Sequence, residues 1–296
     1  MNSSGTLNID VAGAIVEFVA ILKEFKLKEE LYRLVFRGKG LEFEGFRDFS
    51  PDDDASNIDW KASARSPKLL VRQYKEERDL KVMFMIDVGS NMVFGSSEKL
   101  KCEFVAELVC AFANTIISAN DKVGFLLFSD EVKIYVDCFG GEKQFQILAD
   151  KLSKSENYGG KTDLNKALDY ALDYFGDDIS SLVIVSDFLG VNHESESRLN
   201  LLSNHFETIL IMVKDFLDFS LPEADTEVVL ESSSGKEQVI INPKVAKSLY
   251  EEYCILQEKQ AEQIFSRTKA DFLRLVTNKP FAAPLAIFLK ERLERR

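Results

Sequence analysis

The stretch that decides the fold is Lys81-Val82-Met83-Phe84-Met85-Ile86-Asp87-Val88-Gly89-Ser90-Asn91. In it an apolar run ends in a carboxylate, and a polar loop follows. A continuous apolar run of this kind is typical of a strand buried on both faces of a parallel sheet. Residues 182–185 form a second such run, which Asp187 follows closely. Loops that leave parallel strands emerge at one edge of the sheet, so Asp87 and Asp187 are predicted to converge there.

Strand and helix patterns alternate from residue 81 onward, which indicates right-handed crossovers. Strands are expected at 81–87, 123–128, 182–185 and 206–213, helices at 98–119, 142–152 and 164–175, and an antiparallel ribbon at 133–138. The C-terminal part predicts a hairpin (226–230 with 238–241), a helix at 243–268, a strand at 272–276 and a last helix. The fold class is therefore α/β: a doubly wound, mostly parallel sheet with helices on both faces.

The first eighty residues are predicted to form an N-terminal flank, followed by the α/β domain with its C-terminal extension at 81–296. Apolar residues at helical spacing predict an amphipathic helix at 10–31 that docks on the domain. Gly38-Lys39-Gly40 ends that pattern, and residues 41–49 look extended before the acidic cluster Asp52-Asp53-Asp54. A second polar site is one interpretation of Asp52-Asp53-Asp54, Asp59, Lys61 and Arg65. The preferred one is a buried, salt-bridged corner that holds the flank on the sheet, with Trp60 as its apolar plug, because no nucleophile–base pair accompanies these residues.

Composition excludes several classes of function. A formal net charge of -12 and a pI near 4.9 argue against nucleic acid as the main partner. The most apolar N-terminal stretch, residues 11–22, is too short to span a membrane and contains Glu17. No signal peptide is recognisable, so a cytoplasmic protein is expected. The two histidines are too few and too far apart for a zinc protease or a catalytic triad.

Thr162 joins the two aspartates as a third candidate for the edge of the sheet, because it lies in the turn Gly159-Gly160-Lys161-Thr162-Asp163. Two carboxylates and a hydroxyl are oxygen donors of the kind that Mg²⁺ prefers. The alternative is that Asp87 and Asp187 only cap the helices that follow them, by accepting hydrogen bonds from backbone N–H groups. Both interpretations stay open at this point.

Three segments resemble the parts of a von Willebrand factor A-type domain: Phe84–Met92, the turn Gly160–Leu168 and Val183–Phe188. The metal-ion-dependent adhesion site of such a domain uses Asp-x-Ser-x-Ser, a Thr and an Asp. The upstream block resembles the bacterial and archaeal family catalogued as domain of unknown function fifty-eight. That likeness rests on the following residues: Gly40-Leu41-Glu42-Phe43, Arg47, Pro51-Asp52-Asp53-Asp54, Ile58-Asp59-Trp60-Lys61-Ala62-Ser63-Ala64-Arg65 and positions 71–77. The resemblance implies a von Willebrand A-like fold and a MoxR-type AAA+ ATPase as the partner.

Carried over position by position, the adhesion site maps onto Asp87, Thr162 and Asp187 but loses both serines. Gly89, which has no side chain, and Asn91, a weaker amide ligand, stand in their places. Ser90 substitutes only if the loop turns its side chain inward. The predicted metal set is therefore Asp87, Ser90, Asn91, Thr162 and Asp187, with weak or absent binding of Mg²⁺ or Mn²⁺.

Three functions compete. The first is a non-enzymatic protein-interaction module with a degenerate adhesion-type site, working with a MoxR-type ATPase. The second is a metal-dependent phosphohydrolase with Asp87 as nucleophile and Asp187 as a Mg²⁺ ligand. The haloacid-dehalogenase pattern requires an aspartate where Gly89 stands, which counts against it. The third is a structural scaffold with a vestigial site.

Overall fold

The computed structural model describes residues 5–25, 27, 42–50, 58–75, 80–224, 226–231 and 238–295. Contacts divide the chain into a sheet unit, Met1–Phe36 with Leu80–Arg296, and a small unit, Arg37–Asp79. This division shares the predicted boundary near residue 80 but assigns residues 1–36, which include the first helix, to the sheet unit. Three features predicted from the sequence lie outside the described residues: the break at Gly38-Lys39-Gly40, the cluster Asp52-Asp53-Asp54 and the hairpin turn at Ser232-Ser233-Ser234-Gly235.

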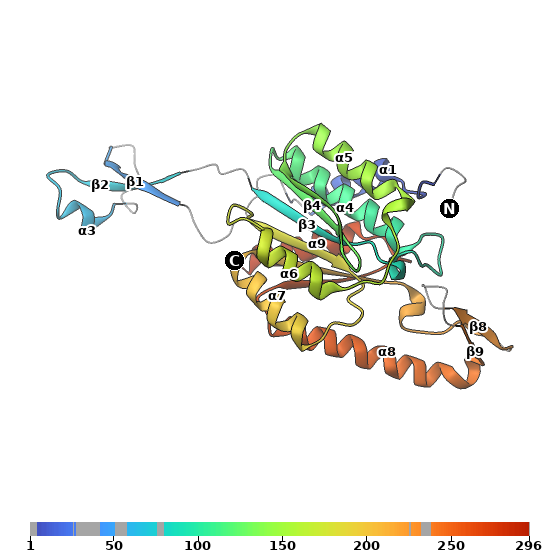
Figure 1. The fold of residues 1–296 in the computed structure, drawn as a ribbon. Coiled ribbons are helices and arrows are strands. Elements are labelled where there is room, and N and C mark those ends of the chain that lie inside the picture. Colours follow the sequence, from blue (N-terminus) through green and yellow to red (C-terminus); the bar gives the residue numbers. More distant parts are fainter. Residues whose placement is uncertain are drawn as a thin grey trace. The chain divides into compact units, whose positions relative to one another are not determined.

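The sheet unit is built on a six-stranded sheet in the order β10-β7-β6-β3-β4-β5 (Figure 1). All neighbouring strands are parallel except β4 and β5, which run antiparallel as the ribbon prediction required. The strands are β3 (Lys81–Asp87), β4 (Lys122–Phe128), β5 (Val132–Phe139), β6 (Ser181–Ser186), β7 (Glu207–Lys214) and β10 (Asp271–Val276). The predicted α/β class and mostly parallel sheet are confirmed.

Helices cover both faces of the sheet, and each face has its own apolar core (Figure 1). One face carries α1 (Val11–Glu24), α4 (Lys101–Ser118), α5 (Glu142–Ser153) and α9 (Ala282–Glu294). The other carries α6 (Leu164–Tyr174), α7 (His193–His205) and α8 (Pro243–Ser266). Helix α1 packs on α4 and α9, so the predicted docking of the N-terminal helix is confirmed. It ends at Glu24, several residues before the predicted limit.

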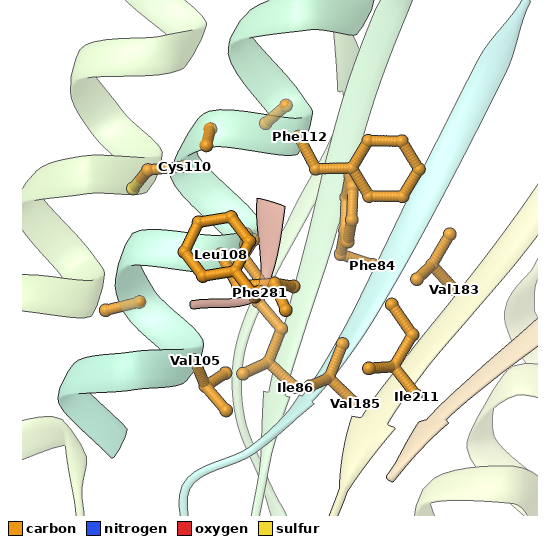
Figure 2. Close-up of a cluster of buried hydrophobic side chains, with 14 of the residues drawn as sticks. Phe84, Ile86, Val105, Leu108, Cys110, Phe112, Val183, Val185, Ile211 and Phe281 are labelled. Carbon is orange, nitrogen blue, oxygen red and sulfur yellow. The ribbon is translucent and has the colours of Figure 1, made fainter. Parts of the chain in front are cut away.

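The buried strands explain the apolar runs of the sequence. Side chains of β3 alternate between the two cores: Phe84 and Ile86 face α4, whereas Met83 and Met85 face α6 and α7. On the α4 side, Phe112 meets Phe84 edge to face, with ring centroids 5.7 Å apart and planes at 80° (Figure 2). Because both faces of the strand lie in apolar cores, every side chain between its two end residues is apolar, and the apolar run of the sequence is therefore continuous.

Helix α7 was not predicted from the sequence. Its sequence is mostly polar, and it buries only a few side chains, among them Leu199 and Leu202. Asn192 caps its first turn by accepting hydrogen bonds from the backbone N–H groups of Glu194 and Ser195, at 2.9 and 3.1 Å. A cap of this kind is visible in a sequence, whereas the packing that stabilises such a polar helix is not.

Short elements complete the sheet unit. Its described residues include three single-turn helices: η2 (Ser90–Met92), η3 (Ser155–Asn157) and η4 (Phe216–Asp218). Strands β8 (Val228–Glu231) and β9 (Gln238–Ile241) form the predicted antiparallel hairpin before α8. Of these, η2 and η4 lie at the ends of strands β3 and β7 and therefore border the carboxyl edge of the sheet.

The small unit pairs β1 (Glu42–Asp48) with β2 (Leu70–Lys75) and adds a short helix, α3 (Trp60–Ser63). Asp59 caps α3 by accepting a hydrogen bond from the backbone N–H of Ala62 at 2.9 Å. The prediction that Trp60 is a buried plug is wrong, because its side chain is 67% exposed. Lys61 and Arg65 are exposed as well. A hairpin with one helical turn encloses too little volume to bury an indole ring.

Candidate functional site

The predicted residues converge at the point where the strand order of the sheet reverses. Strand β3 has β4 on one side and β6 on the other, and the chain crosses to the β6 side only after β4 and β5. Loops on the two sides of such a reversal diverge, and this is where open α/β sheets place their binding sites. Asp87 ends β3, and Asp187 follows β6 directly.

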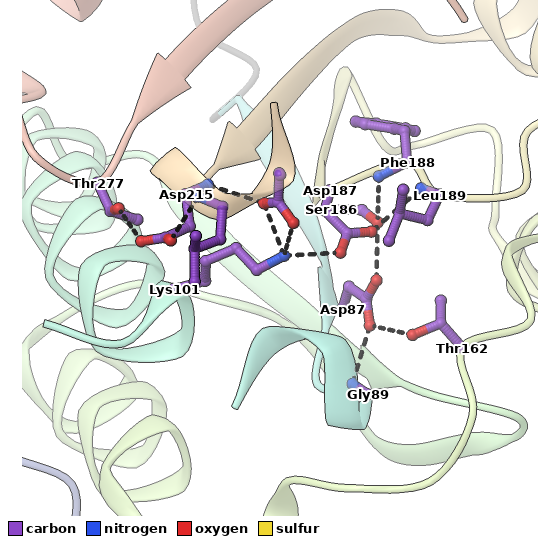
Figure 3. A network of polar contacts seen from close by, with 12 residues as sticks. Asp87, Gly89, Lys101, Thr162, Ser186, Asp187, Phe188, Leu189, Asp215 and Thr277 are labelled. Atoms are coloured by element: carbon purple, nitrogen blue, oxygen red, sulfur yellow. Dashed lines mark hydrogen bonds and ion pairs between the residues drawn. The ribbon is translucent and has the colours of Figure 1, made fainter. Parts of the chain in front are cut away.

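Asp87 is fully buried, and both of its carboxylate oxygens accept hydrogen bonds (Figure 3). Its Oδ1 accepts from the backbone N–H of Gly89 and from the Thr162 hydroxyl, each at 2.8 Å. Its Oδ2 accepts from the Ser186 hydroxyl at 2.7 Å, and Ser186 in turn accepts from the N–H of Phe188 at 3.0 Å. The carboxylate therefore holds together the ends of two strands and the glycine turn.

Asp187 is equally buried but pairs with an ammonium group. Its Oδ2 lies 3.0 Å from the Nζ of Lys101, and its Oδ1 accepts from the N–H of Leu189 at 3.1 Å. Lys101 also lies 3.0 Å from Oδ2 of Asp218, on η4. We call Asp87, Thr162, Ser186, Asp187, Lys101 and Asp218 the carboxylate network.

A glycine turn places Thr162 against Asp87. Gly159 and Gly160 have φ values of 120° and 84°, in the region that side-chain-bearing residues rarely adopt. The turn is fastened to the β3 loop because the N–H of Gly159 donates to the Val88 carbonyl at 2.7 Å. A Cβ on Gly89 would lie 2.0 Å from the Thr162 hydroxyl oxygen. The Thr162 hydroxyl therefore fills the space that a serine at position 89 would need.

Ser90 and Asn91 lie on η2, beside the network. The Ser90 hydroxyl donates to the carbonyl of Gly160 at 2.5 Å. It therefore links the loop after β3 to the glycine turn and does not donate to Asp87. Asn91 is half-buried. Of the five predicted metal ligands, the structure thus brings Asp87, Thr162 and Asp187 together and places Ser90 in a contact between loops.

The electrostatics of the network follow from burial and from the spacing of its charges. Burial, together with the neighbouring charge of Asp187, raises the pKa of Asp87 to about 7, although three hydrogen bonds oppose the shift. Burial lowers the pKa of Lys101, but the charges of Asp187 and Asp218 outweigh burial and raise that pKa overall. Lys101 is therefore a permanent cation, while Asp87 titrates near neutral pH.

Replacing Asp87 with asparagine is expected to change how stability depends on pH. Because the folded-state pKa of about 7 exceeds the ordinary value of 3.8 for an aspartate, the native state binds the extra proton between these pH values. That contribution to stability is present below about pH 4 and is lost as pH rises through 7, with a slope of at most about 1.4 kcal/mol per pH unit. Asp87→Asn should therefore compare more favourably with the wild type at pH 8 than at pH 5, as measured by urea unfolding. A difference that does not vary with pH would contradict the raised pKa.

The donor set does not fit a divalent cation in this arrangement. Each carboxylate oxygen of Asp87 and Asp187 already accepts a hydrogen bond or an ion pair. The Thr162 hydroxyl donates its hydrogen bond to Asp87, and the positive charge of Lys101 repels a second cation. Over the described part of the chain, no cluster of three or more His, Cys, Asp or Glu side chains is arranged to hold a metal. Binding of Mg²⁺ or Mn²⁺ stays a prediction, and these contacts argue against it.

Half of the carboxylate network was not predicted from the sequence: Lys101, Ser186 and Asp218. Ser186 directly precedes Asp187, so a polar pair at the end of an apolar strand was a visible signal. Lys101 carries a weaker signal, because it opens a helix whose first turn favours acidic residues. Nothing in the sequence shows that Asp218, on η4, reaches Lys101.

An open, mostly parallel sheet with an aspartate at its topological switch and a threonine turn beside it defines the von Willebrand A-like class. The chain belongs to the family described as protein of unknown function DUF58, whose model matches residues 45–263. Both predictions made from the sequence, the fold and the family, are confirmed.

Curated relatives include uncharacterized proteins of Mycobacterium bovis and Mycobacterium tuberculosis. Each is 26% identical over 202 residues, which cover 67% of this chain. The chain spans 62% of the length of these relatives. Activities and partners of the whole proteins are therefore matters for proposal.

One solved structure agrees with the fold, and a second is reported for comparison. BatB from Bacteroides thetaiotaomicron, a conserved hypothetical protein, aligns with a TM-score of 0.51 at 12% identity, over 73% of this chain and 99% of that one. The VWA domain of SpRpn10 aligns with a TM-score of 0.41 at 10% identity, over 70% and 93%. At such identities the likeness concerns the fold alone. Among the described residues, no helix has the length and apolar character needed to cross a membrane.

Proposed function

We propose that this chain is a non-enzymatic protein-interaction module that binds its partner at the carboxyl edge of the sheet. One observation carries the proposal: the reactive groups there are buried and bonded to one another, whereas apolar side chains on the surrounding loops are exposed. Leu189, after β6, is 37% exposed, and Phe216, on η4, is 39% exposed. Apolar side chains held on well-anchored loops are typical of contact surfaces.

The geometry supports a contact surface that is held rigid before the partner arrives. The loop after β6 is fixed by the hydrogen bond from Leu189 to Asp187, and η4 is fixed by Asp218 and Lys101. Lys101 joins the two loops because its ammonium contacts both carboxylates. Loops that are ordered in the free protein lose little conformational entropy on binding.

For the partner we propose a MoxR-type AAA+ ATPase in the cytoplasm. The support is the resemblance set out from the sequence, since members of this family are often encoded beside such ATPases. Affinity capture of the neighbouring ATPase from the same genome by the purified chain tests the idea. We expect the ATPase to be retained, and its absence from the eluate at micromolar concentrations of both proteins would contradict the proposal.

Replacing Leu189 and Phe216 together with aspartate is expected to weaken partner binding at least about tenfold, because exposed apolar side chains at the centre of an interface contribute most of its free energy. The free energy of unfolding should change little, since both side chains are exposed. Calorimetric titration of the partner measures the first effect and urea unfolding the second. The matched control is Leu201→Asp on α7, an exposed leucine outside these loops. Equal losses in both variants would argue against this surface.

The burial of Asp87 is the reason for preferring binding over hydrolysis. A carboxylate nucleophile has to reach the phosphorus atom of its substrate, and Asp87 is covered on all sides with both oxygens engaged. Hydrolysis of p-nitrophenyl phosphate in the presence of Mg²⁺, abolished by Asp87→Asn, would reverse this preference. A scaffold with a vestigial site would instead bind no ATPase at all.

A further inference from the structure

Lys101 is a buried cation of the sheet unit, because its side chain is 1% exposed and its ammonium is paired with two carboxylates. Its ammonium lies 3.0 Å from Oδ2 of Asp187 and 3.0 and 3.3 Å from the two oxygens of Asp218 (Figure 3). A buried ammonium is tolerated only where carboxylates compensate it closely. Two carboxylates share this one cation.

The position of Lys101 is determined by three separate elements. It is the first residue of α4, and its backbone N–H donates to the Phe94 carbonyl at 2.8 Å. Asp187 comes from the end of β6, and Asp218 comes from η4, where its Oδ2 also accepts from the N–H of Asp215 at 2.8 Å. A lysine in the first turn of a helix is disfavoured by the helix dipole. The carboxylates, and not the helix, therefore account for a cation at this place.

The same region lacks the means to hold a diffusible cation. Gly89 offers no ligand, and the Thr162 hydroxyl is turned onto Asp87. Asp187 is the carboxylate that the resemblance assigns to the metal, yet its Oδ2 is paired with the ammonium of Lys101. The loss of metal ligands and the presence of a buried cation are independent features of the chain. Both indicate that the site does not take up a divalent cation from solution.

We propose that Lys101 is the built-in cation of this site: it supplies to Asp187 the positive charge that a divalent metal supplies in an adhesion-type site, and it shares that charge with Asp218. As a tethered group it cannot be removed by a chelator, so the loops after β6 and β7 stay in one arrangement whatever the concentration of Mg²⁺. The partner is then bound without a divalent cation, a consequence that rests on the proposed function. The role of Lys101 itself does not depend on that function.

Exchanging the ammonium for a neutral side chain tests the inference. Lys101→Met and the milder Lys101→Gln leave buried carboxylates without compensation, and a divalent cation should then become their counter-ion. We expect ~5 mM Mn²⁺ to raise the melting temperature of the Lys101 variants by about 2 °C or more, and to leave the wild type unchanged. Lys143→Met, which removes an exposed lysine of α5, is the matched control and should behave as the wild type.

A second substitution locates the cation. In Lys101→Met with Asp187→Asn the Mn²⁺ response should disappear, because the carboxylate that attracts the ion is gone. If the Lys101 variants are destabilised but gain no Mn²⁺ response, Lys101 is a structural ion pair only and the proposal is overturned. The proposal is also overturned if Mn²⁺ stabilises the wild type and calorimetry detects its binding, a result that stands even if no Lys101 variant folds.

Partner binding gives a separate readout. If the ATPase is captured, its affinity for the wild-type chain should be equal in EDTA and in Mg²⁺, and a tenfold or larger dependence on Mg²⁺ would contradict the inference. If no ATPase is captured, the proposed function fails, while the thermal experiment still decides the role of Lys101.

Discussion

Lys101→Met is expected to lower the free energy of unfolding by about 3–5 kcal/mol, the range found when one partner of a buried ion pair is removed. The variant keeps a side chain of similar length, so packing at the start of α4 changes little. What it loses is the compensation of Asp187, which is buried, and of Asp218. Urea unfolding at pH 7.5, followed by circular dichroism, measures the change.

A double-mutant cycle with Asp218→Asn separates the pair from the rest of the network. If the ammonium and Asp218 interact directly, the two substitutions together should cost less than the sum of their separate effects. Lys143→Met supplies the baseline for removing a positive charge from the surface. A loss below about 1 kcal/mol for Lys101→Met would mean that the network is more open to water than the structure indicates.

Phe112→Ala is expected to destabilise the sheet unit by about 3–5 kcal/mol, because it leaves a cavity in the core between β3 and α4. The ring is fully buried and meets Phe84 edge to face with ring centroids 5.7 Å apart (Figure 2). It also meets Phe18 edge to face, with centroids 6.3 Å apart. The cost therefore includes lost aromatic contacts as well as lost burial. The same urea experiment reports it.

Phe139→Ala is the matched control, since Phe139 ends β5 with its ring exposed. It should change the free energy of unfolding by no more than about 0.5 kcal/mol. Similar effects for the two phenylalanines would show that the core on the α4 side is loosely packed. Binding of the partner by the folded fraction of either variant should be normal, because neither ring lies on the proposed contact surface.

Much of the sheet could be predicted from the sequence because burial leaves a direct trace in residue order. A strand covered on both faces must be apolar at every position, and Val82–Ile86 and Leu182–Val185 satisfy that condition. Once the strands are parallel, their ends share an edge, so the meeting of Asp87 and Asp187 followed from chain order. No strand ends at Thr162, which lies between η3 and α6 and reaches Asp87 through the glycine turn. Helix α7 escaped prediction because its polar sequence buries so few side chains.

What a buried polar residue contacts could not be predicted, because such contacts join segments far apart in the chain. Lys101 and Asp218 are separated by 117 positions, and no local pattern pairs them. Trp60 shows the reverse error: an indole suggests burial, but the small unit in which it lies is too small to cover it.

The sequence by itself determined the strand run, the parallel sheet, the family and the position of Asp87 and Asp187 at one edge. Only the tertiary structure decided what those residues do there. Packing brought the Thr162 hydroxyl into the space left by Gly89 and the Lys101 ammonium between Asp187 and Asp218. The physical reason is that backbone periodicity and burial are encoded locally, whereas the partner of a buried charge is chosen by whichever element the fold places within about 3 Å of it.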